Sequence, residues 1–190
     1  MKKDLISKKR LIIITLLSSC LLQAGWIPFE HKGPDQMPEV RLVASNELSM
    51  TFDVQLYGCD AQLIDTKDMF NTNNEVFTLL TISDGYHMGE IGKPKLPVIK
   101  KTIGVPHNAR IEIEVLRSEY NDVSLPSFGI DNRIMPALES VLKLPGQKPT
   151  LAIDEIIYGR DALYPQEIVR IEKVDVMRGH RLAVIEVAPI

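Results

Sequence analysis

The sequence predicts an all-β protein, a mainly antiparallel β-sandwich that follows an N-terminal signal-peptide helix. Several segments alternate apolar and polar residues with a period of two, as strands with one buried face require. Stretches rich in Gly, Pro, Asn and Asp separate these segments and are typical of turns between strands. No window has a long apolar stripe with the 3.6-residue period of a helix, so we expect little helix beyond the signal peptide.

The first 24 residues have the composition of a secretory signal peptide. Five Lys and Arg residues lie within the first ten, and an uninterrupted run of apolar or small residues follows from 11 to 22. As a helix this run is about 18 Å long, well short of the ~30 Å hydrocarbon core, so we expect no stable transmembrane anchor. We expect export, with cleavage after Ala24 and a secreted, extracellular or cell-surface domain over residues 25–190.

A second way of processing the N-terminus stays open. Residues 17–20, Leu-Ser-Ser-Cys, resemble a lipoprotein processing site, which would place a lipid on Cys20. The apolar Leu21 and Leu22 that follow favour signal peptidase, although Leu22 is larger than the residue usually found two positions before the last residue removed. Cleavage after Ala24 is therefore the preferred prediction, and a lipoprotein is the alternative.

Two segments show the strand pattern most clearly. In residues 50–56 the even-numbered positions are apolar, and in residues 110–115 apolar Ile111, Ile113 and Val115 alternate with charged residues. We expect the apolar side chains to point into the core and the charged ones to face solvent or a rim. Further strands are expected over residues 40–44, 76–82, 96–103, 153–157, 168–174 and 182–187.

The longest stretch without clear alternation covers residues 125–150. A connection of this length in a compact domain is usually either functional or disordered. It is therefore the first place in the chain to look for a binding loop.

Residues 177–181, Met-Arg-Gly-His-Arg, place three cationic or titratable side chains between two predicted strands. Gly179 suits a tight hairpin because glycine accepts the positive φ angles of hairpin turns. We therefore predict a turn with Arg178, His180 and Arg181 exposed at its tip, and not a catalytic site.

The composition argues against several classes of function. The whole chain has 22 Lys and Arg against 25 Asp and Glu, and without residues 1–24 the balance is 17 against 24, a net charge of −7. An acidic domain with few aromatic residues has little electrostatic basis for binding nucleic acid. The remaining residues, about 166, suffice for one domain with its own core.

No catalytic, metal or cofactor site is expected. The four histidines are scattered without the spacing of metal ligands. Cys59 is the only cysteine of residues 25–190, so an internal disulfide is impossible, and we interpret it as a half-buried small apolar residue and not as a nucleophile. Residues 89–97, Gly-Glu-Ile-Gly-Lys-Pro-Lys-Leu-Pro, fit neither phosphate-binding glycine motif, and we predict a turn that leads into a strand.

Two blocks carry a family resemblance. The first covers residues 89–115, with Gly-x-Pro-x-Leu-Pro, a strand, and a Val-Pro-x-x-Ala step into an alternating strand. The second covers residues 158–190, with its Tyr-Pro, its Met-Arg-Gly-His-Arg and a terminal apolar strand. In this order behind a signal peptide, they resemble the N-terminal propeptide of the gingipain family of secreted caspase-like cysteine peptidases.

The resemblance implies a jelly-roll-like β-sandwich prodomain over residues 25–190. In a larger precursor it would precede a caspase-like peptidase domain, keep that domain latent and help it fold. No catalytic residue carries over, because the family's catalytic His and Cys belong to the peptidase domain. Gingipains accept basic residues before the scissile bond of a substrate. Their prodomains resemble such a substrate at the cleft of the peptidase. Lys143 and Lys148 in the long connection are therefore the candidates for an inhibitory loop, with two solvated loop lysines as the alternative.

A secreted β-sandwich that binds glycan or protein at the cell surface, with no peptidase attached, is the alternative function. The fold alone does not separate the two functions. A sugar-binding face usually displays exposed aromatic side chains, whereas Phe, Trp and Tyr make up 6% of this chain and Trp26 is its only tryptophan. The low aromatic content disfavours the binding module.

Overall fold

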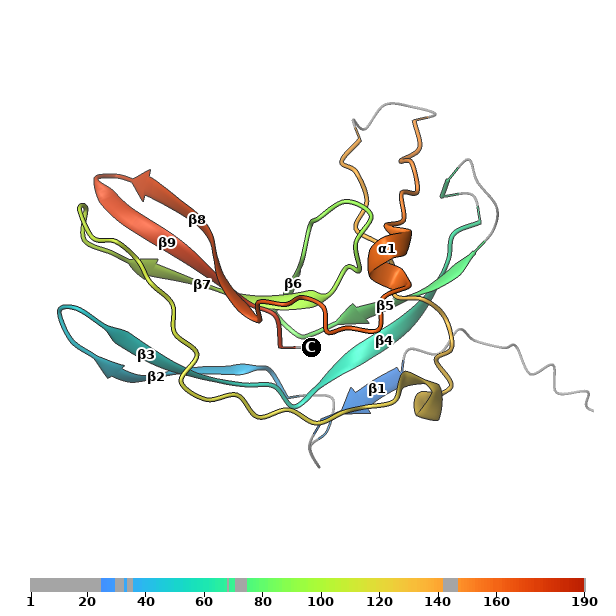
Figure 1. Cartoon of the computed structure of the whole chain (residues 1–190), viewed down its shortest axis with the longest axis horizontal. Helices are drawn as coiled ribbons and strands as arrows, with labels where there is room; N and C mark the ends of the chain where they lie inside the picture. Colours follow the sequence, from blue (N-terminus) through green and yellow to red (C-terminus); the bar gives the residue numbers. More distant parts are fainter. Residues whose placement is uncertain are drawn as a thin grey trace, which may run out of the picture.

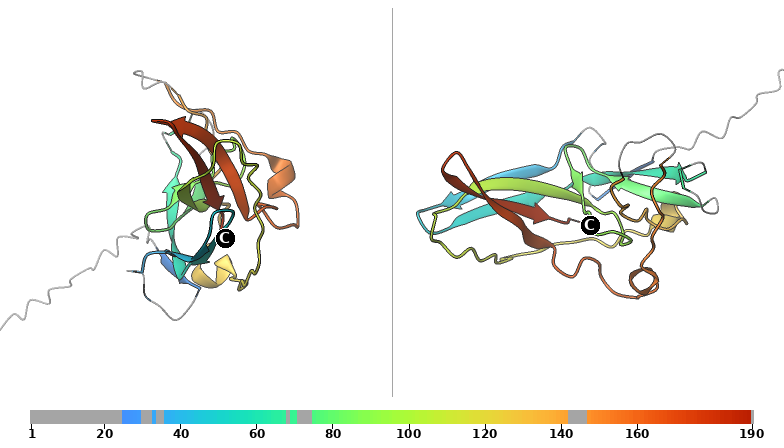
Figure 2. Two further views of the ribbon diagram at one scale, coloured as in Figure 1. Left: turned by 90° about the vertical axis from the view of Figure 1, so that its left-hand side faces the viewer. Right: turned by 90° about the horizontal axis from the view of Figure 1, so that it is seen from above.

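The computed structural model describes residues 25–29, 33, 36–67, 69–70, 75–141 and 147–189, so that Cys20 and Ala24 lie outside the described residues. The chain forms a mainly antiparallel β structure that is elongated, with two hairpins at one end and loops at the other (Figures 1 and 2). Helix is limited in these residues to η1 (Leu125–Phe128) and α1 (Glu155–Tyr158), each four residues long. The predicted all-β fold is confirmed.

The described strands form three sheets, in all of which neighbouring strands are antiparallel. The first sheet has the order β1-β4-β5, the second is the β2-β3 hairpin, and the third has the order β6-β7-β9-β8. In chain order the strands are β1 (Gly25–Pro28), β2 (Glu39–Ser45), β3 (Met50–Gln55), β4 (Gly58–Asp65), β5 (Val76–Thr81), β6 (Tyr86–His87), β7 (Pro97–Gly104), β8 (Val169–Met177) and β9 (His180–Val187).

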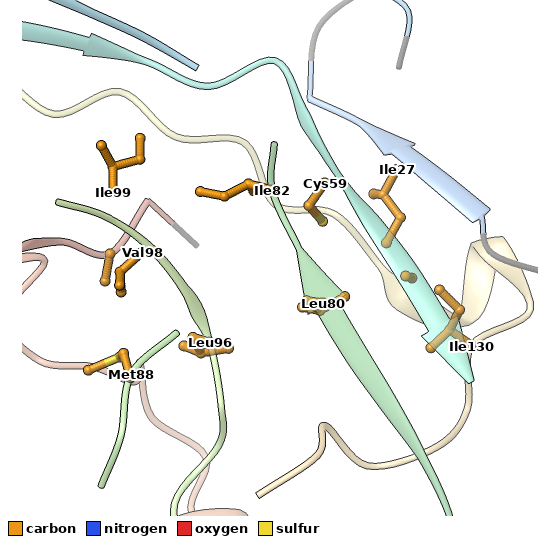
Figure 3. Packing of buried hydrophobic residues seen from close by; sticks show 11 residues of the cluster. Ile27, Cys59, Leu80, Ile82, Met88, Leu96, Val98, Ile99 and Ile130 are labelled. Carbon is orange, nitrogen blue, oxygen red and sulfur yellow. The ribbon is translucent and has the colours of Figure 1, made fainter. Parts of the chain in front are cut away.

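The main core lies between the first and third sheets (Figure 3). Ile27, Cys59 and Leu80 come from β1, β4 and β5, and pack in one cluster with Leu96 and Val98 at the start of β7. Burial of an aliphatic side chain of this size contributes about 1.5–3 kcal/mol. This layer therefore fixes the two sheets against each other.

Cys59 is more deeply buried than the half-buried position predicted for it. It is 1% exposed, and burial, with a smaller contribution from Asp60, raises the pKa of its thiol to about 12. A thiol with this pKa stays protonated near neutral pH and is a poor nucleophile. The structure therefore supports the interpretation of Cys59 as a small apolar core residue.

Residues 111–115 are not a strand, and the prediction that their apolar side chains all point into the core is wrong. Ile111 is half-buried, but Ile113 and Val115 are 37% and 47% exposed, and the stretch pairs with no strand of the described chain. Alternation indicates an extended backbone with one apolar face. Pairing also needs a neighbouring strand, which the local sequence does not specify.

The strand predicted over residues 153–157 is also wrong, because α1 begins within it. The carboxylate of Asp154 accepts hydrogen bonds from the backbone N–H groups of Ile156 and Ile157, both at 3.2 Å. Such an N-cap satisfies N–H groups that have no partner in the first helical turn, and so stabilises the turn.

The hairpin turn predicted at residues 177–181 is confirmed. Met177 pairs with His180, and the intervening Arg178 and Gly179 have φ angles of 51° and 80°. Two consecutive positive φ angles are what a two-residue type I′ turn requires. Arg178 and His180 are exposed at the tip, as expected.

Arg181 departs from the prediction that it is exposed. It is half-buried, and its guanidinium donates hydrogen bonds to the carbonyl oxygens of Pro106 and Ala109, both at 2.7 Å. His107 in the same loop donates from Nε2 to the carbonyl oxygen of Gly179 at 2.9 Å. The β8-β9 turn therefore holds the loop that follows β7.

Candidate functional site

The first half of the long connection at residues 125–150 is attached to the body of the domain. Beyond η1, residues 133–135 run beside β5, and residues 136 and 137 lie beside the segment of residues 91–94. The backbone N–H of Thr78 in β5 donates to the carbonyl oxygen of Arg133 at 2.8 Å, and the N–H of Met135 donates back to the carbonyl oxygen of Thr78 at 2.7 Å. This part of the connection is therefore fixed to the body of the domain.

Residues 138–153 leave the body and return to it, and we call them the projecting loop (Figure 1). The structure describes the outgoing part to 141 and the returning part from 147, and Lys143 lies outside the described residues. Lys148 on the returning part is exposed and makes no ion pair within the described parts of the chain. The structure thus places one of the two candidate lysines on a loop that extends from the domain.

A small second core supports the base of the projecting loop. Phe70, Phe77 and Met135 are its buried residues, each at most 5% exposed. Leu138 of the outgoing part and two residues of the returning part, Leu151 and Ile153, pack against them. Both parts of the loop are therefore attached to the same apolar cluster.

Gly92 joins the two ends of the projecting loop through its backbone. Its N–H donates to the carbonyl oxygen of Ala137 at 2.9 Å, and its carbonyl oxygen accepts from the N–H of Asp154 at 2.8 Å. We call this pair of hydrogen bonds the Gly92 bridge. Because Ala137 and Asp154 flank the loop directly, the bridge sets the distance between the points where the loop leaves and returns.

The backbone conformation at Gly92 favours glycine. Its φ is +81°, and a Cβ atom there would lie 3.5 Å from the N of Asp154 and 3.6 Å from the carbonyl of Ala152. L-residues pay about 1–2 kcal/mol to adopt this left-handed region. Sequence analysis predicted a turn here and missed the connection to residues 137 and 154, for which the only local signal is the glycine itself.

A network of charged side chains fixes the segment that carries Gly92 to the third sheet. Glu90 forms ion pairs with Lys93 and, at 3.1 Å, with Arg170 of β8. Arg170 also contacts Glu186 of β9 at 2.7 Å, and Lys100 of β7 contacts the same carboxylate at 3.3 Å. Glu186 is 3% exposed, so both of its partners neutralise a buried charge.

The charged neighbours in this network lower the pKa of Glu90. The hydrogen bond from Lys93 is the largest cause that lowers it, and Arg170 adds to the effect. The two cations stabilise the ionised carboxylate more than the protonated one. The segment is thus held most firmly when Glu90 is charged.

The described residues hold no cluster of metal-ligand type, and one histidine among them has a shifted pKa. They contain no group of three or more His, Cys, Asp or Glu residues that could hold a metal ion. His87 binds the carbonyl oxygen of Leu80 through Nε2 at 2.9 Å, and burial lowers its pKa. Among the described helices, none has the length and apolar character needed to cross a membrane.

Comparison with known protein families shows which family this chain belongs to. The family model Propeptide_C25 matches residues 31–190. The chain belongs to the Propeptide_C25 family. The predicted resemblance to a gingipain propeptide is confirmed, and the match favours a propeptide over the alternative of a free-standing binding module.

The curated relatives of this Propeptide_C25 chain are gingipains of Porphyromonas gingivalis. Lys-gingipain HG66 is 25% identical over 179 residues, which cover 94% of this chain and 10% of the relative. Gingipain R2 is 27% identical over 194 residues, which cover 100% of this chain and 24% of the relative. The chain therefore spans between a tenth and a quarter of the length of these relatives.

Two solved structures have a similar fold. A structure reported as "Structural insight into zymogenic latency of gingipain K from Porphyromonas gingivalis" aligns with a TM-score of 0.70 and 22% identity, over 88% of this chain and 86% of that one. A complex of Porphyromonas gingivalis RgpB pro- and mature domains aligns with a TM-score of 0.53 and 21% identity, over 79% and 71% of the two chains. These matches show the fold.

The Glu90 network predicts a dependence of stability on pH. The folded-state pKa of Glu90 lies below its usual value of 4.5, so its contribution is present above about pH 4.5 and is lost as the pH falls through the folded-state pKa. We expect Glu90→Gln to lower the urea midpoint at pH 7 and to converge with the wild type once the pH has fallen below the folded-state pKa of Glu90.

The matched control is Glu112→Gln, because among the described residues Glu112 pairs only with Arg110, at a site where both side chains are largely exposed. We expect this variant to follow the wild-type urea midpoint across the whole pH range. A constant difference between Glu90→Gln and wild type from pH 7 to pH 3 would contradict the assignment.

Proposed function

We propose that this chain is the N-terminal prodomain of a secreted gingipain-like cysteine endopeptidase, and that it keeps the downstream peptidase domain latent and assists its folding. The observation that carries the proposal is the family match over residues 31–190 in a chain that spans 10% and 24% of its gingipain relatives. The fold shared with a structure reported for zymogenic latency supports it.

In this proposal the projecting loop is the element that enters the substrate cleft. A cleft accepts a convex element, and a loop that is held at its base loses less conformational entropy on binding than a free one. The Gly92 bridge and the second core supply that support. The third sheet and the main core provide the rigid body behind it.

We further propose that Lys148 or Lys143 occupies the primary specificity pocket. Lys148 supports this role because it is exposed and makes no ion pair with a described residue, so its ammonium is available to a carboxylate of the peptidase. Lys143 is supported only by its place in the same loop. The names of the relatives, Lys-gingipain and Gingipain R2, do not decide which basic residue the peptidase of this precursor accepts.

We propose that residues 1–24 direct export and are removed after Ala24. The basic start and the short apolar run support this, and the gingipain relatives make an exported protein the expected context. Intact-mass analysis of the exported protein should give an N-terminus at Gly25. An N-terminus at Cys20 with the added mass of a lipid would instead establish the lipoprotein alternative.

Inhibition in trans tests the latency proposal and the role of the Gly92 bridge together. Purified residues 25–190 should inhibit the separately produced peptidase domain, with lower apparent affinity than in the precursor because tethering raises the effective concentration. Gly92→Ala should weaken this inhibition by about tenfold, because a strain of about 1–2 kcal/mol falls on the base of the projecting loop.

Gly129→Ala is the control for Gly92→Ala. Gly129 also has a positive φ, 73°, and open space where a Cβ would lie, but it ends η1, where its N–H donates to carbonyl oxygens of η1 itself. We expect it to cost similar stability and to leave the inhibition constant within about twofold. Equal loss of inhibition in both variants would refute the role of the bridge, and no inhibition by the wild-type chain at micromolar concentration would refute the latency proposal.

Substitution of Lys143 or Lys148 tests whether a basic side chain of the projecting loop occupies the primary specificity pocket of the peptidase. Loss of a desolvated charge pair at an interface costs roughly 2–5 kcal/mol and acts mainly on the dissociation rate. Lys148→Ala or Lys143→Ala should therefore raise the dissociation rate of the inhibited complex at least about thirtyfold, measured by surface plasmon resonance. Lys173→Ala, which removes an exposed lysine of β8, should change it little. If neither loop variant differs from Lys173→Ala, another surface of the domain does the blocking.

A further inference from the structure

Residues 110–120 form a long extended stretch of chain without regular secondary structure (Figure 1). Arg110 pairs with Glu112 at 3.1 Å, and Arg117 pairs with Glu119. Side chains two residues apart lie on the same side of the chain in an extended backbone, whereas in a helix they do not face each other. The two ion pairs therefore fit an extended conformation of this segment.

The segment is attached at both ends and unpaired between them. Before it, the N–H of Val105 donates to the carbonyl oxygen of Arg181 at 2.9 Å. After it, the amide of Asn121 lies 3.4 Å from the carbonyl oxygen of Phe29, and Val123 packs against the main core. Between these points the described chain shows no β-bridge and no backbone hydrogen bond from residues 111–120.

The unpaired segment is exposed and partly apolar. The exposed fractions rise along it from 37% at Ile113 and 47% at Val115 to 71% at Leu116 and 80% at Tyr120. An exposed strand with free N–H and C=O groups and apolar side chains is a template for pairing with another chain, which folded proteins normally cover or block. The sequence of this segment is typical of a strand, yet the segment pairs with no described strand. This conflict indicates that the strand that pairs with it belongs to a partner.

The segment is separate from the projecting loop. It runs from the end of the molecule that carries the hairpin tips along the lower edge in Figure 1, and the view from above shows the same lengthwise course (Figure 2, right). It passes near β3, because Asp53 of that strand adds to the effect of Glu119 in raising the pKa of Arg117. A partner bound here would therefore contact a second surface of the domain.

We propose that residues 110–120 form a β-augmentation edge that pairs with an extended strand of the peptidase domain in the same precursor. This inference rests on the proposed function. The gingipain relatives contain far more chain than this segment, which covers 24% of Gingipain R2 and 10% of Lys-gingipain HG66. A strand in the same polypeptide has a higher effective concentration at this edge than a second copy of the chain.

The side chains define the chemistry of the partner strand. Ile113 and Val115 call for apolar residues at every second position of the partner, on the same face. Glu114 on the opposite face makes no ion pair with a described residue, so a Lys or Arg opposite it would be favoured. Backbone hydrogen bonds would supply affinity, and these alternate contacts would supply specificity.

Amide hydrogen exchange tests the pairing directly. In isolated residues 25–190 the amides of residues 111–120 should exchange as fast as those of an exposed loop. In the complex with the peptidase domain, and in the uncleaved precursor, every second amide of residues 111–120 should slow by roughly tenfold or more, because a strand added along one edge bonds only the amides that point to it, and hydrogen-bonded amides exchange only through opening. Protection already present in the isolated chain would mean that the segment pairs within its own domain, and would overturn the proposal.

A matched pair of proline substitutions provides the second test. The amide N–H groups of an extended strand point alternately to its two edges, so those of Glu114 and Arg117 point to opposite edges. Because proline has no amide N–H, each proline variant removes one of these two donors. One of Glu114→Pro and Arg117→Pro should weaken inhibition in trans about tenfold, and the other should stay within about twofold. Neither should change the urea midpoint of the isolated chain, because neither amide is bonded there.

The outcomes separate this inference from the proposed function. If the wild-type chain does not inhibit the peptidase, the proposed function fails and this inference fails with it. If it inhibits while residues 111–120 stay unprotected, or if both proline variants or neither weaken inhibition, only the β-augmentation edge is refuted.

Discussion

The geometry of the projecting loop depends on two backbone hydrogen bonds made by one residue. Gly92 donates to Ala137 and accepts from Asp154, which are the residues that flank the loop. A loop closed by such a bridge behaves as a shorter loop, because the entropy of bringing its ends together has already been lost in folding. The positive φ of Gly92 makes the bridge specific to glycine. The position of the loop relative to the sheets thus follows from a segment that the sequence places far from it.

The Gly92 bridge in turn needs a fixed platform, and two different interactions provide it. The second core of Phe70, Phe77 and Met135 attaches the loop to β5 through apolar contacts. The ion pairs of Glu90, Arg170 and Glu186 attach the Gly92 segment to β8 and β9. Ion pairs to a buried carboxylate such as Glu186 contribute little net stability, but they penalise any arrangement that separates the charges, and so favour one geometry. The apolar contacts and the ion pairs together hold the projecting loop in one place relative to the sheets.

The sequence predicted the features that depend on local chemistry. The all-β class follows from period-two alternation, and the β8-β9 turn follows from Gly179, because a two-residue hairpin needs positive φ. Features that depend on distant residues were missed. The Gly92 bridge joins residues on three separate segments of the chain. The strand β4 shows little alternation because its first residues are buried on both faces. At 111–115 the alternation predicted a strand, but the described chain offers no strand to pair with it. At 153–157 a strand was predicted, but the side chain of Asp154 caps a helical turn there.

The central claim is that the projecting loop enters the cleft of the peptidase domain, and the most direct measurement is the reactivity of a thiol placed on it. Thr150 is exposed on the returning part of the loop, and the native Cys59 is 1% exposed, so the thiol introduced by Thr150→Cys would react on a low background. Labelling of the prodomain, followed by mass spectrometry, should slow at least about tenfold when the peptidase domain is bound, while a thiol introduced by Glu47→Cys at the β2-β3 turn should react at an unchanged rate. An unchanged rate at position 150 in a complex that is fully inhibited would contradict the account.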